Sequence, residues 1–256
     1  MKFCIISPLS ELDLMLHGDM IFALAHLYKN PAYRRMLHSC KKKGKYIIMD
    51  NGSAEDSMVK TPELIDICRD LCPDEVIAPD VFFDRNETLS HLETFVDELD
   101  YTGLLGRIKI QAVPQGNTRE EWLDCYSKMT NAEEVDVIGF SKRVVTWCFL
   151  GFKDDQGIAS GRHAAVEYLE LNKMMKKPIH MLGAGDPREF AFYLHNPYVR
   201  SNDSSNTIWA SMNGIDFSKG DFRRIKTSKD YFERNLTSDE LELAISNIIW
   251  VEKHSQ

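Results

Sequence analysis

Four side chains that could carry chemistry each lie at the end of an expected strand: Asp50, Asp80, Gln115 and Asp203. Paired carboxylates can divide labour, because one stays ionised as a nucleophile while another takes or gives a proton. An aspartate after a strand is often only a turn former or a helix cap, so each is weak evidence alone. Their recurrence in order along the chain is what indicates a shared site, with Asp203 as the working carboxylate.

Three glycines, Gly139, Gly183 and Gly185, also lie at expected strand ends, where the absence of a side chain would let a ligand approach the backbone closely. Together with the carboxylates and the amide, they suit a small planar ring better than a phosphate-rich cofactor. At a sugar C1′ carbon, two aspartates perform glycosidic-bond chemistry through an oxocarbenium-like state, and a retaining reaction passes through a covalent sugar–enzyme intermediate.

Regular alternation of strands and helices must position these residues. The expected strands are 3–6, 46–49, 75–78, 107–113, 135–138, 178–182 and the run before Asp203, with the eighth placed within 207–211, where the pattern is weakest. The stretch from about Ser10 to Tyr28 is expected to be helical, with an interruption near Gly18. This alternation predicts a parallel sheet with right-handed crossovers. We therefore expect one α/β domain over 1–256, a single and irregular (β/α)8 TIM barrel. The carboxyl ends of its strands would bring the candidate side chains together at one mouth of the barrel.

Two segments interrupt the alternation. Residues 142–160 are irregular and are expected to form a lid, an insertion or an extra hairpin, whereas 216–236 is a basic loop segment. The formal net charge of −8 excludes a generally cationic coat and leaves room for a local basic face. For the basic loop, contact with nucleic-acid phosphates and simple solvation are equally good interpretations.

Composition sets further bounds. No run reaches the roughly 18 to 20 apolar residues of a membrane span, so we expect no membrane association and a cytoplasmic protein. The six cysteines are scattered in apolar surroundings and are expected to be reduced thiols. No cofactor and no metal site are expected, since Cys68 and Cys72 make a poor metal site without further ligands.

Six short motifs occur in an order that resembles the tRNA-guanine transglycosylase superfamily, most closely its compact, DNA-directed 7-deazaguanine members from phages and bacteria. The motifs are Met49-Asp50-Asn51-Gly52-Ser53, Ala78-Pro79-Asp80, Ala112-Val113-Pro114-Gln115-Gly116, Val137-Ile138-Gly139-Phe140, His180 to Pro187 and Asn202-Asp203-Ser204-Ser205. The resemblance covers roughly residues 47–215, and its order rather than any single motif is specific.

The resemblance implies a role for each motif. Asp203 would be the nucleophile and Asp50 the general acid/base, while Asp80, Gln115, Gly139, Gly183 and Gly185 would bind the base. The implied reaction replaces guanine in nucleic acid with a 7-deazaguanine derivative, as in queuine incorporation. Candidate phosphate contacts are Lys142, Arg143, Arg223, Arg224 and Lys226. The family's barrels often pair, so a homodimer or a partner subunit is a further expectation, and a phage-encoded protein would act in the host cytoplasm.

Departures from the family keep alternatives open. The zinc signature Cys-x-Cys-x-x-Cys with a distant His is absent, so we expect no zinc-binding subdomain. The chain is also short, which favours DNA over tRNA as substrate. Atypical Asn51 leaves room for a catalytically inert binding subunit, and the acidic net charge would suit an unrelated barrel glycosidase or lyase acting on a small metabolite. His180 could point into the barrel, but a satisfied core histidine is the preferred interpretation.

Overall fold

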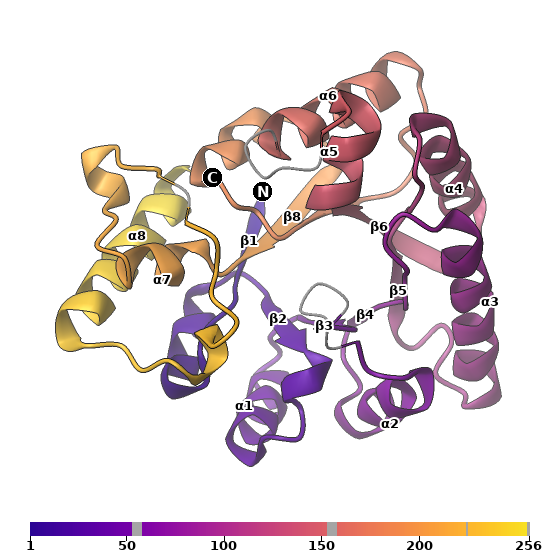
Figure 1. Cartoon of the computed structure of the whole chain (residues 1–256). Coiled ribbons are helices and arrows are strands. Elements are labelled where there is room, and N and C mark those ends of the chain that lie inside the picture. The colour runs from indigo at the N-terminus through magenta and orange to yellow at the C-terminus, as the bar shows by residue number, and fades with distance from the viewer. Residues whose placement is uncertain (53–57, 153–157, 224, 255–256) are drawn as a thin grey trace.

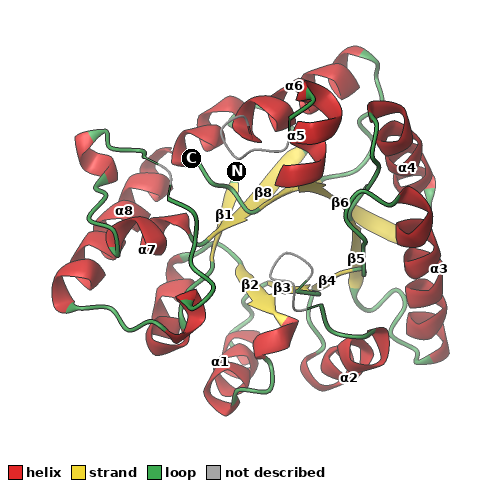
Figure 2. Ribbon diagram, in the orientation of Figure 1, coloured by secondary structure: helices red, strands yellow, loops and turns green. Residues whose placement is uncertain are grey.

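A computed structural model describes residues 1–52, 58–152, 158–223 and 225–254. In the described residues, parallel strands form a nearly closed barrel with helices around it, which confirms the predicted single (β/α)8 architecture (Figures 1 and 2). The strand order is β1-β8-β7-β6-β5-β4-β3-β2. A single parallel bridge between Cys4 and Met20 brings the two outer members of this order, β1 and β2, together.

The strands are short and almost wholly buried. They are β1 (Lys2–Ile5), β2 (Ile21–Leu24), β3 (Ile47–Asp50), β4 (Glu75–Ile77), β5 (Lys109–Ala112), β6 (Val135–Ser141), β7 (Ile179–Leu182) and β8 (Val199–Ser204). Each is covered by helices on one side and by the opposite strands of the barrel on the other. This is why strands such as β2 and β3 have continuous apolar sequences rather than alternating ones, whereas β8 (Val-Arg-Ser-Asn-Asp-Ser) is buried although it is polar.

The helices mostly follow the strands in sequence. They are α1 (Pro31–Lys42), α2 (Thr61–Leu71), α3 (Arg85–Tyr101), α4 (Arg119–Asn131), α5 (Lys142–Leu150), α6 (Ile158–Leu171), α7 (Asn206–Ser211) and α8 (Ser238–His254), with 3-10 segments η1 (Leu9–His17), η2 (Ala25–Leu27), η4 (Pro187–Tyr193), η5 (Phe217–Lys219) and η6 (Tyr231–Glu233). Side-chain caps define several starts: Asn30, Asp84 and Thr118 each accept hydrogen bonds from the first turn of their helix.

The position of one strand was predicted wrongly. The eighth strand is not within 207–211, because those residues belong to α7; it is β2, inside the stretch expected to be helical. All four residues of β2 are buried, on both faces. A run of four apolar residues without alternation gives no periodicity with which to separate a buried strand from a buried helix.

The segment expected to be a lid or hairpin contains a helix. Residues 142–150 form α5, which begins directly at the end of β6 and packs against α6. Residues 153–157 lie outside the described part of the chain. The predicted basic loop, 216–236, connects α7 to α8 and holds two short 3-10 turns, η5 and η6.

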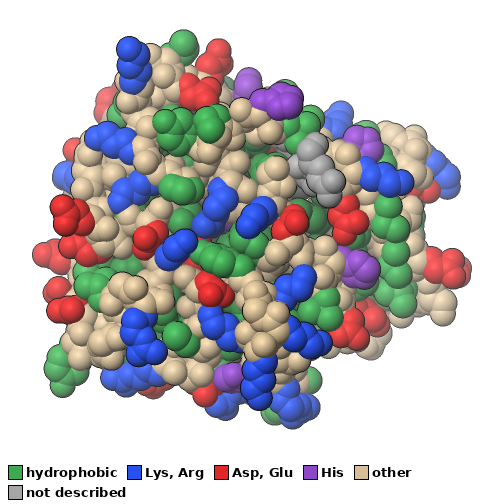
Figure 3. Space-filling model, turned by 180° about the vertical axis from the view of Figure 1, so that it is seen from behind, with side chains coloured by type: hydrophobic (Ala, Val, Ile, Leu, Met, Phe, Trp, Pro, Cys, Tyr) green, Lys and Arg blue, Asp and Glu red, His purple; other side chains and the backbone are tan. Residues whose placement is uncertain are grey.

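Two buried clusters make up the core. The larger lies between the strands and the surrounding helices α1 to α6, and includes Trp122, Phe140 and Phe95. The smaller extends from the barrel interior to α7 and α8 and includes Phe22, Ile48 and Ile248. On the face opposite the view of Figure 1, lysine and arginine side chains are interspersed with aspartate and glutamate (Figure 3).

Candidate active site

Asp203 is the penultimate residue of β8 and its carboxylate is held asymmetrically. Oδ1 accepts two hydrogen bonds, from His180 Nε2 and from the backbone N–H of Gly183, each at 3.0 Å. Among the described residues, no hydrogen bond reaches Oδ2. The side chain is 4% exposed. One oxygen is therefore held by two donors, while the other accepts no hydrogen bond from the described residues.

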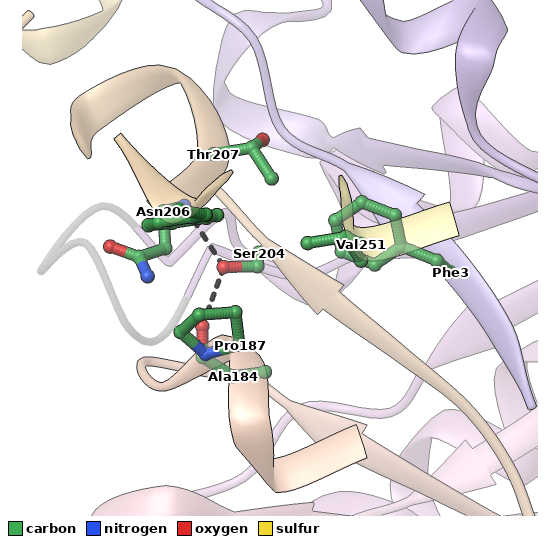
Figure 4. Close-up of a pocket in the computed structure, with 8 residues that line it drawn as sticks. Phe3, Ala184, Pro187, Ser204, Asn206, Thr207 and Val251 are labelled. Carbon is green, nitrogen blue, oxygen red and sulfur yellow. Dashed lines mark hydrogen bonds between the residues drawn. The ribbon is translucent and has the colours of Figure 1, made fainter. Parts of the chain in front are cut away.

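The turn after β7 is bound to the end of β8 by more than this contact. The backbone N–H of Ala184 donates to the carbonyl oxygen of Asp203 at 2.8 Å. Ser204 Oγ donates to the carbonyl of Ala184 and accepts from the N–H of Asn206, as the dashed lines of Figure 4 show. Gly183 itself adopts φ +65°, a left-handed conformation that favours glycine. Together these contacts present the Gly183 N–H to Asp203.

The pocket drawn in Figure 4 lies on the other side of β8. Phe3, Val251 and Thr207 line it, together with Ser204. Because successive side chains of a strand point to opposite faces, Ser204 faces this outer pocket while Asp203 faces the barrel interior. The pocket is therefore part of the packing between β8 and the helices, separate from the candidate site.

Asp80 and Gln115 are in direct contact. Gln115 Nε2 donates to Asp80 Oδ2 at 2.5 Å, and the backbone N–H of Phe83 donates to Gln115 Oε1 at 3.2 Å. Asn51 Nδ2 donates to Asp80 Oδ1 at 3.2 Å and to the carbonyl of Ala78 at 2.9 Å. Both oxygens of Asp80 thus receive amide donors, which stabilise its ionised form.

Asp50 ends β3, and its Oδ2 accepts a hydrogen bond from the N–H of Gly52 at 2.8 Å. The side chain is buried, yet β3 and β8 are not neighbours: β2 and β1 lie between them on one side of the barrel. Asp50 and Asp203 therefore approach the mouth from strands that are not adjacent in the barrel. Asn51, the departure from the family motif, bridges β3 to Asp80.

The predicted glycines differ in their surroundings. A side chain at Gly139 would meet Gln111 Nε2 at 2.6 Å and the side chains of Val113 and Leu182 at 3.0 Å, so Gly139 allows close packing inside the barrel. A side chain at Gly183 would meet Lys142 Cδ at 3.4 Å. Lys142 thus lies beside the turn that holds Asp203. Gly185 lies in the same turn, before η4.

A buried ion pair supports this turn from behind. Arg162 of α6 contacts Glu189 of η4 at 2.5 Å, and the two side chains are 0% and 2% exposed. Arg162 also donates to the carbonyl of Leu182 at 2.6 Å. One guanidinium therefore connects α6, the end of β7 and η4, the elements on either side of Gly183.

Two of the candidate nucleic-acid contacts, Arg143 and Arg223, have partners within the chain. Arg143 lies over the ring of Phe82, with its guanidinium carbon 5.8 Å from the ring centre. Arg223 pairs with Asp221 at 2.7 Å. Arg224 lies outside the described residues, and Lys226 is exposed. Tyr231 anchors the basic loop by donating to the carbonyl of Ile6, just past β1, at 2.7 Å. The loop therefore lies near the carboxyl end of that strand.

Sequence reasoning missed three residues of the site. His180 contacts the candidate nucleophile, Ser201 contacts His180, and Asn51 contacts Asp80. His180 and Ser201 are placed at the centres of strands, where side chains usually only pack. A signal was present for one of them, because His180 is the only histidine within a predicted strand.

No group of three or more His, Cys, Asp or Glu side chains that could hold a metal ion occurs among the described residues. All six cysteines are free thiols. Burial raises the pKa of Cys125 to about 11, and the hydrogen bond from the Gln115 N–H opposes this effect.

In the described part of the chain, no helix has the length and apolar character needed to cross a membrane.

No protein-family model matches the chain, and no curated protein matches it significantly.

Proposed function

We propose that the protein is a base-exchange glycosyltransferase that replaces guanine in nucleic acid, DNA in preference to tRNA, with a 7-deazaguanine derivative. The observation that carries this proposal is the asymmetry of Asp203: Oδ1 is fixed by two donors and Oδ2 is open. A carboxylate held in this way has one oxygen oriented for attack on a sugar carbon.

The proposed reaction has two displacements. Asp203 Oδ2 forms a bond to C1′ as the bond from C1′ to guanine breaks, and guanine leaves with the electron pair and takes a proton from Asp50. The 7-deazaguanine then gives a proton to Asp50 and attacks C1′, and the C1′–Oδ2 bond breaks with its electron pair returning to the carboxylate. The second displacement restores both the enzyme and the original configuration at C1′.

The pair formed by Asp80 and Gln115 is suited to reading a purine edge. An ionised carboxylate accepts from the N–H groups of guanine, and the bond from the Phe83 N–H fixes which end of the Gln115 amide is the acceptor. The interior position of Gly139 and the turn with Gly183 and Gly185 would let the flat base approach the backbone.

The positive side chains fit contact with a flipped-out nucleotide. Lys142 and Arg143 begin the helix that follows β6, and Lys142 lies beside Gly183. The basic loop is anchored next to the end of β1. Phosphate contacts from both directions would hold a strand over the mouth while the target nucleotide leaves the stack.

The test is the release of labelled guanine from duplex DNA, single-stranded DNA and tRNA, with and without a 7-deazaguanine acceptor. Exchange on DNA is expected, and Asp203→Asn should abolish it. Asp186→Asn is the matched control, because Asp186 caps η4 and pairs with the exposed Arg188, and asparagine caps a helix equally well. Exchange on tRNA alone would keep the chemistry and change the substrate.

An absence of exchange on every substrate would overturn the proposal. Binding of nucleic acid without exchange would then favour an inert binding subunit. Failure to bind any nucleic acid at low salt would favour a barrel glycosidase or lyase acting on a small metabolite.

A further inference from the structure

A continuous chain of hydrogen bonds runs through the barrel interior and ends at Asp203. Arg200 Nε donates to Ser201 Oγ at 3.1 Å, Ser201 Oγ lies 2.8 Å from His180 Nδ1, and His180 Nε2 lies 3.0 Å from Asp203 Oδ1. Ser201 and His180 are fully buried. This series of hydrogen bonds joins Arg200, in the amino-terminal half of β8, to the Asp203 carboxylate near the end of the same strand.

The start of this chain is firmly anchored. Arg200 makes a two-bond contact with Glu75, at 2.8 and 2.9 Å, and Tyr46 also donates to Glu75 at 2.8 Å. Burial opposes the charge on Arg200, but the bonds to Glu75 outweigh this and raise its pKa. Arg200 is therefore a permanent cation with a fixed orientation, and its Nε can only donate.

The two ends of the chain determine the direction of every bond in it. Arg200 donates to Ser201 Oγ, so among the described contacts the hydroxyl hydrogen of Ser201 has a partner only if His180 Nδ1 accepts it. Because an ionised carboxylate has no proton to donate, His180 Nε2 must carry the hydrogen of the bond to Asp203. The form of His180 that makes all three bonds and also gives the serine hydrogen a partner is the neutral tautomer protonated at Nε2.

A doubly protonated His180 would break this pattern. Its Nδ1–H would point at Ser201 Oγ, which already accepts from Arg200, and the serine hydrogen would be left without a partner in a fully buried environment. Such an unsatisfied buried group is costly. The ring of His180 is also stacked on Phe22, with 5.5 Å between the ring centres and 6° between the planes, so it cannot rotate to find other partners without losing this contact.

We propose that Arg200 and Ser201 fix His180 as the neutral Nε2–H tautomer, and that His180 is thereby a positioning residue that holds the nucleophile Asp203 and favours its release from the sugar. The second half of this statement rests on the proposed function. His180 acts through Asp203 and does not contact the reacting carbon.

The consequence for the reaction follows from the charge on Oδ1. The donated hydrogen bond is strongest when Asp203 is a carboxylate and weaker when Oδ2 is esterified to C1′. His180 therefore favours the free carboxylate over the covalent adduct. In the second displacement the carboxylate is the leaving group, so the donor stabilises the charge that develops there. The adduct should break down quickly and should not accumulate.

The tautomer can be measured without any substrate. Nitrogen-15 NMR of histidine-labelled protein at neutral pH should show His180 with a hydrogen on Nε2 and a bare, hydrogen-bonded Nδ1, and loss of the signal in His180→Phe assigns it. In Ser201→Ala the donor to Nδ1 is removed, so Nδ1 can take a hydrogen and the signal should change to a mixture of the neutral Nε2–H form and the doubly protonated form. A wild-type His180 with a hydrogen on Nδ1, whether neutral or doubly protonated, would overturn the proposal.

The kinetic half needs two variants of His180. His180→Phe keeps a ring against Phe22 and removes the donor, whereas His180→Gln offers an amide N–H in the place of Nε2. Intact-protein mass spectrometry during exchange should show roughly a ten- to hundredfold greater ratio of adduct to free enzyme in His180→Phe than in the wild type, the size expected for a hydrogen bond to a charged group. His180→Gln should restore most of the wild-type ratio.

The two proposals fail in different ways. If the wild type exchanges bases and both His180 variants give the wild-type adduct ratio, the positioning role is wrong and the transglycosylase function stands. If the wild type exchanges nothing, the proposed function falls, and the NMR spectrum alone decides whether Arg200 and Ser201 fix the tautomer. Thermal melting of each variant separates loss of fold from either result.

Discussion

Gln115 Nε2 lies 2.5 Å from Asp80 Oδ2, and the N–H of Phe83 binds the other end of the same amide. Phe83 has a φ of +65°, an unusual conformation for a bulky residue. Strained backbone of this kind persists where surrounding contacts determine it, and it is concentrated at functional sites. Gln115 is thus held with a defined orientation, in contrast with the other buried glutamine of the barrel interior.

Gln115 and Gln111 should respond differently to substitution by methionine. Gln115→Met leaves Asp80 with one fewer donor and should lower the free energy of unfolding by about 1–3 kcal/mol. The amide of Gln111, fully buried, has no hydrogen-bond partner among the described residues, so Gln111→Met should be neutral or stabilising. Urea denaturation measures both. Equal losses for the two variants would contradict this account of their contacts.

The ion pair between Arg162 and Glu189, behind the turn that contains Gly183, should be important to stability. Arg162→Met leaves Glu189 buried without its partner and should cost about 3–5 kcal/mol, whereas the double variant Arg162→Met with Glu189→Met should lose much less. Denaturation midpoints of the single and double variants provide the comparison. A double variant that is as unstable as the single one would show that the pair matters through its bonds to the carbonyl of Leu182 instead.

Replacement of Cys72, at the end of α2, by glycine should relieve strain in the backbone and so favour the folded state. Cys72 has a φ of +48° at the C-terminal cap, where a residue with a β-carbon is strained. Cys72→Gly should be more stable than Cys72→Ala by about 1 kcal/mol. Both variants remove the thiol, so the comparison isolates the backbone conformation, and thermal unfolding of the pair is sufficient. An alanine variant of equal stability would rule out strain at this position.

Stability should depend on pH through Asp70, which joins α2 to α1. Hydrogen bonds from Tyr28, then from Arg34, lower the pKa of Asp70 to about 2. Since its pKa is lower in the folded protein than the roughly 3.9 of an unfolded chain, its stabilisation is complete above that value and is lost as pH falls towards 2. The side chain is 35% exposed, so solvent screening reduces the contribution to about 1 kcal/mol.

Asp70→Asn tests this dependence. The variant should be less stable than the wild type at pH 7, and the difference should narrow as the pH is lowered from 5 to 2. Asp66→Asn, on the same helix, is the control: Asp66 contacts Arg69 at 3.5 Å and is 73% exposed, so its replacement should change little at any pH. A constant difference between wild type and Asp70→Asn across this range would contradict the assignment.

The amino-acid sequence by itself determined the class of fold and the order of the candidate residues. Apolar runs such as 46–49 and 178–182 alternate with helical segments that have clear caps, and this alternation indicates a parallel α/β arrangement. The capping and turn signals can be recognised in the sequence because each depends on only a few neighbouring residues. Asp50, Asp80 and Asp203 could be placed at strand ends for the same reason. These features depend on residues that are close together in the sequence, so they can be predicted from a single sequence.

Tertiary structure alone decided which side chains meet. Residues 21–24 became a strand because a gap remained between β1 and β3 in the barrel, although their own pattern is equally compatible with a buried helix. His180 became the partner of both Ser201 and Asp203 because the register of β7 on β8 sets it beside them. Such contacts depend on the packing of strands that are distant from one another in sequence, as the ion pair between Arg200 of β8 and Glu75 of β4 shows, and no local pattern encodes the hydrogen-bond direction that these residues impose.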